Sequence, residues 1–227
     1  MKKELQQNRL PALEEAVRKA GFPDKVLPEI RREIREARGV SCQACFSLRL
    51  DKDRVTGHLS FERDDEEEPF RLAYFYLDLG PRLHTHFHDA HFHFGQGFDL
   101  TLREGYNLIC GRSIFRRLSD DLAGNGCWIS LDRTVPDDDD LRFLIHPYGF
   151  SFSSAFYRCG LHAYRTPLQL EELERSLKEG NRQEPDLVVK GVPTRVWVEV
   201  SEGHQSVCVR DGEGERVCLP VEADHQE

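Results

Sequence analysis

Apolar residues follow two different periods in the first part of the chain. Residues 11–20 and 28–38 carry apolar side chains at helical spacing, and each segment stops at a glycine, so the pattern predicts two helices. Apolar and polar residues then alternate in three successive segments, at residues 45–50, 55–63 and 70–79. This alternation, with polar turns between the segments, predicts an antiparallel three-stranded meander.

The rest of the chain mixes helix and strand signals. Thr101 and Glu104 have the spacing of a capping box, which predicts a helix that ends before Gly111. A threonine–proline pair at residues 166–167 starts another helix, which ends at Gly180. Shorter elements are expected as a helix at 153–159 and strands at 113–118, 127–131, 141–145, 187–190, 196–200, 206–210 and 216–219. Helices and antiparallel strands in this order predict an α+β fold.

Two parts of the second half share a skeleton of helix, glycine stop and tryptophan strand. Trp128 follows Gly111 by 17 residues. Trp197 follows Gly180 by the same interval of 17 residues, and the chain has only these two tryptophans. Each unit would be a helix followed by a hairpin whose second strand places the tryptophan in the core. Either an internal duplication or a coincidence explains the repeated pattern.

These patterns predict three regions along the chain. Residues 1–80 would hold the helical N-terminus and the meander, and residues 81–220 would hold two helix-plus-hairpin units. Residues 221–227 would form a frayed tail. A length of 227 residues suits one substantial domain or two small lobes that share a core.

Composition and charge narrow the classes of function. No apolar run approaches the roughly 18 residues of a membrane span, and the N-terminus lacks the apolar core of a signal peptide. The seven cysteines, an odd number, fit a reducing compartment, so we expect a cytoplasmic protein. The net charge of −9 argues against general binding to nucleic acids or anionic membranes. The two acidic runs, at 64–68 and 137–140, are interpreted as solvated turns.

Residues 84–93 are the chemically unusual part of the sequence, because histidines fill half of the segment. On a strand, His84, His86 and His88 would project from one face. Together with His91 they could bind a transition metal such as Zn²⁺, since neutral imidazoles that converge on one ion are good ligands. The segment therefore supports a metal-binding hypothesis.

Other features weaken that hypothesis. From His86 the order is H-x-H-D-x-H, which departs from the H-x-H-x-D-H pattern of metallo-hydrolases. Asp89 and the C-x-x-C pair formed by Cys42 and Cys45 could add ligands, but a single such pair is a weak zinc pattern. A polar, histidine-rich edge strand or connecting segment explains the same residues without a metal.

The sequence contains no template for catalysis that we can assign. It lacks the G-x-S-x-G nucleophile motif, a phosphate-binding glycine loop and a dinucleotide-binding fingerprint. The histidine cluster has no assignable catalytic role either. We therefore expect a non-catalytic binding or accessory module without a cofactor, rather than an enzyme.

Several motifs occur here in the same order as in a known family. Residues 102–108 resemble that family's K-E-A-Y-N-L helix, and residues 111–113 resemble the G-R-A-V that follows it. Further matches are residues 127–132 with A-W-x-x-L-D, 147–150 with N-Y-G-Y-D-L and 176–181 with S-L-K-K-G-N. From about residue 20 to 218, the chain thus resembles a family of uncharacterised bacterial proteins, a domain of unknown function.

The resemblance implies an accessory role and no particular catalytic activity. Members of the family are often associated with conjugative or other mobile elements, and no catalytic residues carry over from them. The matching residues are mostly glycines, aromatics and leucines, which fix turns and cores. In the family the segment before the capped helix is an ordinary strand, so a metal site at the histidines would be private to this chain.

Three functions remain open from the sequence. The first is a module that binds a protein partner through clustered arginines, with Arg112, Arg116 and Arg117 as candidate anchors. The second is a metal-binding protein that uses the histidine cluster. The third, nucleic-acid binding, is disfavoured by the net charge, although a local arginine face could still support it.

Overall fold

The structure, a computed structural model, describes residues 2–80, 89–95, 99–117, 126–132, 142–146, 149–201 and 206–220, with side chains from residue 10 onward. The chain divides into two compact units. The first unit is Met1–Cys110 with Asp132–Arg142, and the second is Gly111–Leu131 with Phe143–Glu227. Both contain helices and antiparallel strands, so the predicted α+β class is confirmed. None of the described helices is both long and apolar enough to cross a membrane.

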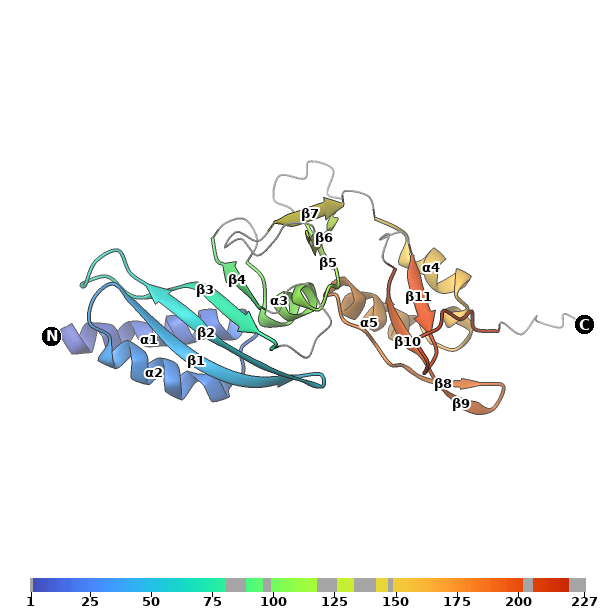
Figure 1. Cartoon of the computed structure of the whole chain (residues 1–227), viewed down its shortest axis with the longest axis horizontal. Helices are drawn as coiled ribbons and strands as arrows, with labels where there is room; N and C mark the ends of the chain where they lie inside the picture. The colour runs from blue at the N-terminus through green and yellow to red at the C-terminus, as the bar shows by residue number, and fades with distance from the viewer. Residues whose placement is uncertain are drawn as a thin grey trace, which may run out of the picture. The chain divides into compact units, whose positions relative to one another are not determined.

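The first unit begins with two helices and continues as an antiparallel sheet (Figure 1). Helices α1 (Lys2–Lys19) and α2 (Leu27–Glu36) are joined through the 3-10 turn Asp24–Val26. The sheet follows in the order β1 (Ser41–Leu50), β2 (Asp53–Glu62), β3 (Arg71–Asp78) and β4 (Asp89–His93). Helix α3 (Leu102–Ile109) comes next. The predicted meander is confirmed, and β4 adds a fourth strand beside β3.

Alternation along the strands sends one set of side chains toward the helices and the other set away from them. The inward set is apolar and buried: Phe46, Leu48, Val55, Leu59, Phe75, Leu77 and Phe92. Phe22, which lies between the two N-terminal helices, packs edge-on against Phe46 and Phe75 at ring-centroid distances of 5.3 and 5.5 Å. The helices therefore cover the apolar face, whereas the intervening strand positions carry polar and aromatic side chains.

Gly105 allows helix α3 to lie close to this sheet. A Cβ atom at residue 105 would lie 2.9 Å from Cε2 of Phe75 and 3.0 Å from Cε2 of Phe92. Helix propensity alone treats the glycine as a weak point of the helix, but here it avoids a steric conflict with two core rings. The predicted capping box is confirmed, because Thr101 Oγ1 accepts from the Glu104 N–H and the Glu104 carboxylate accepts from the Thr101 N–H.

Helix α1 starts earlier than the sequence predicts. It begins at Lys2 and contains Pro11 in its interior, whereas the proline was expected at the first turn. A proline has no N–H to donate, so one position of the helical hydrogen-bond ladder stays empty there. The difference shows that a proline alone is a weak guide to where this helix starts.

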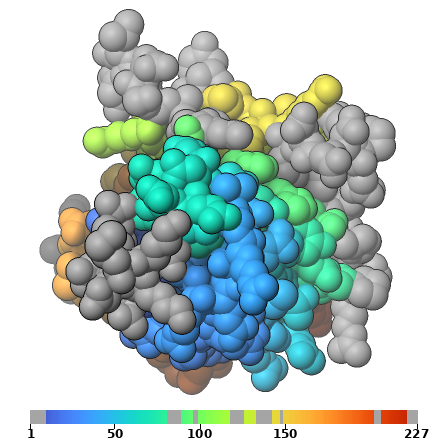
Figure 2. Space-filling model, turned by 90° about the vertical axis from the view of Figure 1, so that its left-hand side faces the viewer, coloured from blue at the N-terminus to red at the C-terminus, as the bar shows by residue number. Residues whose placement is uncertain are grey.

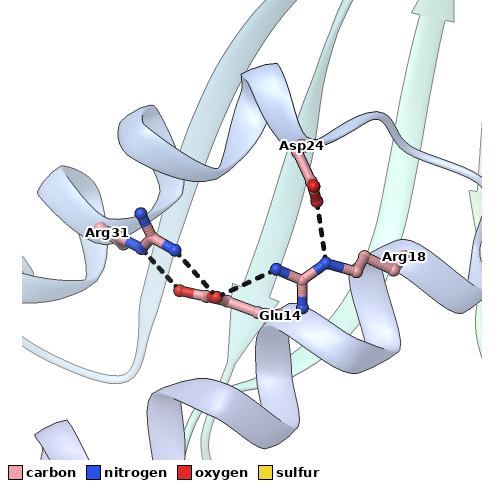
Figure 3. A network of polar contacts seen from close by, with 4 residues as sticks. All are labelled: Glu14, Arg18, Asp24 and Arg31. Atoms are coloured by element: carbon pink, nitrogen blue, oxygen red, sulfur yellow. Dashed lines mark hydrogen bonds and ion pairs between the residues drawn. The ribbon is translucent and has the colours of Figure 1, made fainter.

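A buried carboxylate joins the two N-terminal helices (Figure 3). Glu14 of α1 is 8% exposed, and its oxygens accept two hydrogen bonds from Arg31 of α2, at 2.6 and 3.0 Å. Arg18 donates to Glu14 at 3.5 Å and to Asp24 at 2.8 Å. The hydrogen bond from Arg31 lowers the pKa of Glu14, and the burial of the carboxylate opposes this effect. The network depends on the charged form of Glu14.

The acidic run at residues 64–68 forms the connection between β2 and β3. Each of its residues is exposed, and the segment stands at the surface of the end of the first unit that faces the viewer in Figure 2 (teal). Asp65 Oδ1 accepts hydrogen bonds from the backbone N–H groups of Glu67 and Glu68, at 2.7 and 3.0 Å. The interpretation of this run as a solvated turn is confirmed, while the run at 137–140 lies outside the described residues.

The second unit contains short antiparallel sheets and two helices in its described part. Its strands are β5 (Ile114–Arg116), β6 (Cys127–Leu131), β7 (Phe143–His146), β8 (Asp186–Val189), β9 (Val192–Arg195), β10 (Trp197–Val200) and β11 (Val207–Arg210). Strands β5, β6 and β7 form one sheet, β8 pairs with β9, and β10 pairs with β11. Helices α4 (Phe152–Arg158) and α5 (Pro167–Lys178), with the 3-10 turn Leu161–Ala163 between them, separate β7 from β8 along the chain.

The core of the second unit gathers side chains from α4, α5 and four strands, β6, β8, β10 and β11. Its buried members include Trp128, Phe152, Phe156, Leu161, Leu177, Val198, Val207 and Val209. In this unit one strand prediction is wrong, and one strand was not predicted. Residues 216–219 form only a bridge from Arg216 to Arg210 rather than a strand. Strand β9 carries no strand signal in the sequence, because Pro193 interrupts the pattern.

The two glycine-to-tryptophan segments have the same strand register. Gly111 and Gly180 both adopt positive φ, at 77° and 81°, which L-residues with a Cβ atom rarely do. Three residues after each glycine, the backbone pairs with the residue that follows the tryptophan: Ile114 with Ile129, and Gln183 with Val198. A shared register is not expected from coincidence, so it favours an internal duplication.

The tryptophans of the two segments differ in their surroundings. Trp128 is 1% exposed, as predicted for a core residue. Trp197 is only half-buried, and the guanidinium carbons of Arg182 and Arg195 lie 5.9 and 5.4 Å from its ring centroid. The prediction that both tryptophans enter the core is wrong for Trp197, because flanking arginines stack on it near the surface.

We expect the network around Glu14 to make the first unit sensitive to acid. Because the pKa of Glu14 is lowered in the folded state, its stabilising effect is complete above the ordinary value of 4.5 and is lost as the pH falls through the lowered value. Glu14→Gln should therefore be less stable than the wild type by about 1 kcal/mol at neutral pH, since the partly exposed arginines are screened by water. At an acid pH below that lowered pKa, the Glu14 carboxyl is protonated and the difference should nearly vanish.

Urea unfolding followed by circular dichroism at both pH values measures this difference. Glu15→Gln is the matched control, because Glu15 is the exposed neighbour of Glu14 on the same helix. A stability loss in Glu14→Gln that stays the same at acid pH would show that side-chain shape, rather than charge, is what the network needs.

Candidate functional site

The outward side of the first unit's sheet carries an ordered array of polar and aromatic side chains. Cys45, His58, Tyr76 and His91 stand directly opposite one another across β1, β2, β3 and β4. Two neighbouring rows on the same side of the sheet flank this row. One consists of Gln43, Ser60, Tyr74 and His93, and the other of Ser47, Thr56, Asp78 and Asp89. We call these twelve residues the His–Tyr face. All but Ser60 are exposed or half-buried.

The rings of this face contact one another closely. The ring centroid of Tyr76 lies 5.1 Å from that of His58 and 4.7 Å from that of His91. The two imidazoles, His58 and His91, are 6.1 Å apart although their strands are not neighbours. Tyr74 extends the cluster, at 5.3 Å from His91 and 5.1 Å from His93. The face therefore presents a continuous aromatic surface in its centre.

Hydrogen bonds fix both tyrosines in place. The Tyr76 hydroxyl donates to Asp89 Oδ2 at 2.7 Å, and Gln43 Nε2 donates to the Tyr74 hydroxyl at 3.1 Å. Burial raises the pKa of Tyr76, and the hydrogen bond to the Asp89 carboxylate raises it further. Tyr76 therefore stays a neutral hydrogen-bond donor to Asp89 at physiological pH.

The protonation of His58 is disfavoured in this array. Burial lowers the pKa of His58, and repulsion from a charged His91 lowers it further. His58 Nε2 is buried and accepts no hydrogen bond within the described part of the chain. At neutral pH the centre of the face thus holds an uncharged imidazole between two tyrosine rings.

The formal charge of the twelve residues is negative, although Arg54 of β2, in the adjoining row, donates to Ser47 of the face at 3.2 Å. None of its twelve residues is a lysine or an arginine, and Asp78 and Asp89 stand opposite each other on β3 and β4. Like charges in directly opposite cross-strand positions repel each other. Asp78 Oδ1 accepts a hydrogen bond from the Gly80 N–H at 2.7 Å, and a carboxylate can accept more than one hydrogen bond.

The structure describes only some of the predicted metal ligands. His84, His86 and His88 lie outside the described residues, whereas His91 stands on β4. Cys42 and Cys45 cannot converge, because residues at odd spacing on a strand point to opposite sides of the sheet. Burial raises the pKa of Cys42 to about 11, while Cys45 is exposed. Among the described residues, no three His, Cys, Asp or Glu side chains are placed to hold a metal ion.

The predicted arginine anchors belong to the second unit. Arg116 ends β5 opposite Cys127 and is half-buried, as is Arg112, and each makes contacts within the protein. Arg117 directly follows β5 and is exposed. Of the three candidates, Arg117 is the one whose side chain is most accessible to a partner.

The second unit has an open hollow lined by aromatic rings, which we call the aromatic hollow. Its volume is about 590 Å³, and its lining consists of Phe115, Gly126, Trp128, Gly149, Phe150, Ser151, Phe152, Ser153, Glu174 and Lys178. The Trp128 and Phe150 rings are parallel to within 3°, with centroids 6.0 Å apart. A Cβ atom at Gly126 would lie 2.5 Å from the Phe115 ring, so only glycine fits beside this wall. Its volume falls within the range of small-ligand sites.

A further cavity, of about 540 Å³, lies in the first unit beside α1. Leu13 and Ala16 of α1 form one wall, and Phe70, Phe94 and Leu100 contribute to the rest. Its lining is mainly aliphatic and aromatic, so it offers apolar surface rather than polar recognition. The charged and titratable groups discussed above are not part of it.

Comparisons with known proteins gave no match to this chain, whether with protein-family models, curated proteins or solved structures. The site is therefore defined by its own residues. His58, Tyr74 and Tyr76 were not predicted as site residues, although all three occupy polar positions of the alternating strands, which is the signal that could have identified them.

The lowered pKa of His58 can be measured directly. The unfolded chain binds the proton more readily than the folded one, so the folded state should lose stability as the pH falls from 6.5 through the lowered pKa. In His91→Gln the repulsive charge is gone, and the pKa of His58 should rise part of the way toward 6.5. Titration of the imidazole Cε1–H signals by NMR gives both values.

The control for this titration is His162→Gln, which changes a histidine of the second unit that stacks on Tyr157. It should leave the pKa of His58 unchanged. A pKa of His58 at or above its ordinary value in the wild type would show that the imidazole is solvated, and the packing described for the face would then be wrong.

Proposed function

We propose that the chain is a non-catalytic binding module, which holds a basic segment of a partner protein on the His–Tyr face. The observation that carries this proposal is the opposed pair Asp78 and Asp89 beside the rings of Tyr74 and Tyr76. A lysine or arginine side chain of the partner would relieve the repulsion between the carboxylates. It would also lie against tyrosine rings, whose faces attract cations.

The composition of the face favours a protein over a nucleic acid. Nucleic-acid binding depends on cationic groups that neutralise phosphates, and the twelve positions of the face supply two carboxylates and no lysine or arginine. Tyrosine is enriched where proteins bind one another, because it combines a large ring with a hydroxyl group. The net charge of −9 would also steer basic partners toward the molecule.

The free cysteines and the family resemblance support a cytoplasmic, bacterial setting for this proposal. All seven cysteines are free thiols, which agrees with a reducing cytoplasm. The resemblance to a bacterial domain of unknown function suggests a partner among the proteins of a mobile element. Many such proteins would have basic segments, because they handle DNA, whose phosphates require cationic groups.

Binding of a labelled hexa-arginine peptide, followed by fluorescence anisotropy at about 150 mM salt, tests the proposal. Asp78→Asn/Asp89→Asn should weaken binding about tenfold or more, since it removes both carboxylates of the face. The matched control is Glu66→Gln/Glu67→Gln, which removes the same charge from the exposed turn between β2 and β3. That control should change the affinity by less than about twofold.

The ring contribution is tested in the same assay. Tyr74→Ala/Tyr76→Ala should weaken binding, while Tyr157→Ala, at a tyrosine 68% exposed in the second unit, should not. Equal weakening by the two charge-removing variants would show that the peptide responds to net charge alone. That result, or binding that survives the loss of both tyrosines, would refute the face as the binding site.

One observation favours metal binding as a second candidate function. His91, a member of the predicted set, has the His58 ring 6.1 Å away, and the lowered pKa of His58 keeps that imidazole in the neutral form that metals require. Two imidazoles provide half of a tetrahedral zinc site. The other ligands would have to come from water or from neighbouring side chains.

Elemental analysis of tag-free protein purified without chelator tests this candidate. A metal site on the face predicts close to one equivalent of zinc or another transition metal, lost in His58→Asn/His91→Asn and retained in the His162→Asn control. His86→Ala/His88→Ala shows in parallel whether the neighbouring histidines contribute. Wild-type protein without metal, even after incubation with Zn²⁺ and desalting, would exclude the candidate.

A further inference from the structure

The aromatic hollow of the second unit already contains a cation. The Lys178 ammonium lies 5.4 Å from the ring centroid of Phe115 and 5.6 Å from that of Phe152. Both distances fall within the range in which an ammonium group is attracted to the negative face of an aromatic ring. The ammonium also lies 2.6 Å from Oε1 of Glu174, one turn earlier on α5. The hollow thus combines ring faces with a carboxylate.

This internal cation is held weakly. The side chains of Lys178 and Glu174 are 37% and 34% exposed, so water screens their attraction. Helix pairs of this spacing contribute little to stability. A lysine chain is also flexible and can swing into solvent. A competing cation with better contacts could therefore displace the Lys178 ammonium from the rings.

The hollow is larger than one ammonium group requires. Its volume of about 590 Å³ suits a small organic ligand. Several aromatic rings form its walls. Phe115 meets Trp128 edge to face, with ring centroids 5.3 Å apart, and Phe150 is parallel to Trp128 at 6.0 Å. Alkyl groups on a cation lower the free energy needed to remove it from water, and they make apolar contacts with such rings.

We propose that the aromatic hollow binds a trimethylammonium group, with Glu174 as its counter-ion and Lys178 as an internal competitor. An anionic ligand fits the same surroundings less well. It would have to break the Lys178–Glu174 pair, and it would lie against ring faces that repel negative charge. The proposal does not depend on the function assigned to the His–Tyr face, because it uses other residues in the other unit.

Titration with choline, followed by NMR, tests the proposal on the full chain. The reporter is the indole N–H signal of Trp128, which lines the hollow and is assigned in a Trp197→Phe background that leaves a single tryptophan. The reference ligand is 3,3-dimethylbutan-1-ol, which has the shape of choline but no charge. Choline should bind at least about tenfold more tightly than this alcohol at equal ionic strength.

Two variants of the charged pair separate a cation site from an anion site. Lys178→Met should tighten choline binding several-fold, because it removes the competitor and leaves Glu174 without its partner. Glu174→Gln should weaken it. A site for anions would show the opposite order, with Lys178→Met as the damaging change. Phe115→Leu should weaken binding by removing one wall, with folding checked by circular dichroism.

The natural source of the group is tested with a second probe. A short peptide that contains trimethyllysine is compared with the same peptide with unmodified lysine and with free choline. Tighter binding of the trimethyllysine peptide than of choline assigns the site to a modified protein, and the reverse assigns it to a small metabolite. Equal binding of choline and its uncharged analogue, or no shift of the Trp128 signal with any trimethylammonium probe, overturns the proposal.

Discussion

The register of the four-stranded sheet is the constraint on which the first unit depends. Because strand side chains alternate, Phe75 and Leu77 can enter the core only if Tyr74 and Tyr76 point away from it. A slip of one residue would expose the two buried side chains and bury the two tyrosines. Burial of the apolar set beneath the helices therefore also orders the outward set. The side chains of the candidate binding face are thus positioned by the packing of the opposite side of the sheet.

Features that depend on neighbouring residues were predictable from the sequence. The strands of the meander and the capping box of α3 are encoded within a few residues, and the structure confirms them. The pairing of β3 with β4 is different, because residues 79–88 separate the two strands and no local pattern fixes their register. The row that joins His58, Tyr76 and His91 depends on that pairing, so it could not be read from the sequence alone.

The two glycine–tryptophan segments share a backbone pairing but differ in how their tryptophans are packed. Both copies reproduce the same backbone pairing, which begins three residues after each glycine stop. The burial of each tryptophan depends on what the rest of the chain packs against it. Trp128 lies among the rings of the hollow, whereas the Trp197 ring is contacted by the guanidinium groups of Arg182 and Arg195. The aromatic hollow was likewise hidden, since its walls come from segments far apart in the sequence.

A cation on the His–Tyr face and a proton on His58 must oppose each other. Both add positive charge to the same small area, so each makes the other less favourable, and the coupling is reciprocal. Since burial and His91 already lower the pKa of His58, the imidazole is neutral at pH 7 and the opposed carboxylates Asp78 and Asp89 determine the charge of the face. As the pH falls through the lowered pKa of His58, the imidazole gains a proton and the face loses part of its negative character. A basic partner would be released over that range, and a bound partner would in turn move the titration of His58 to still lower pH.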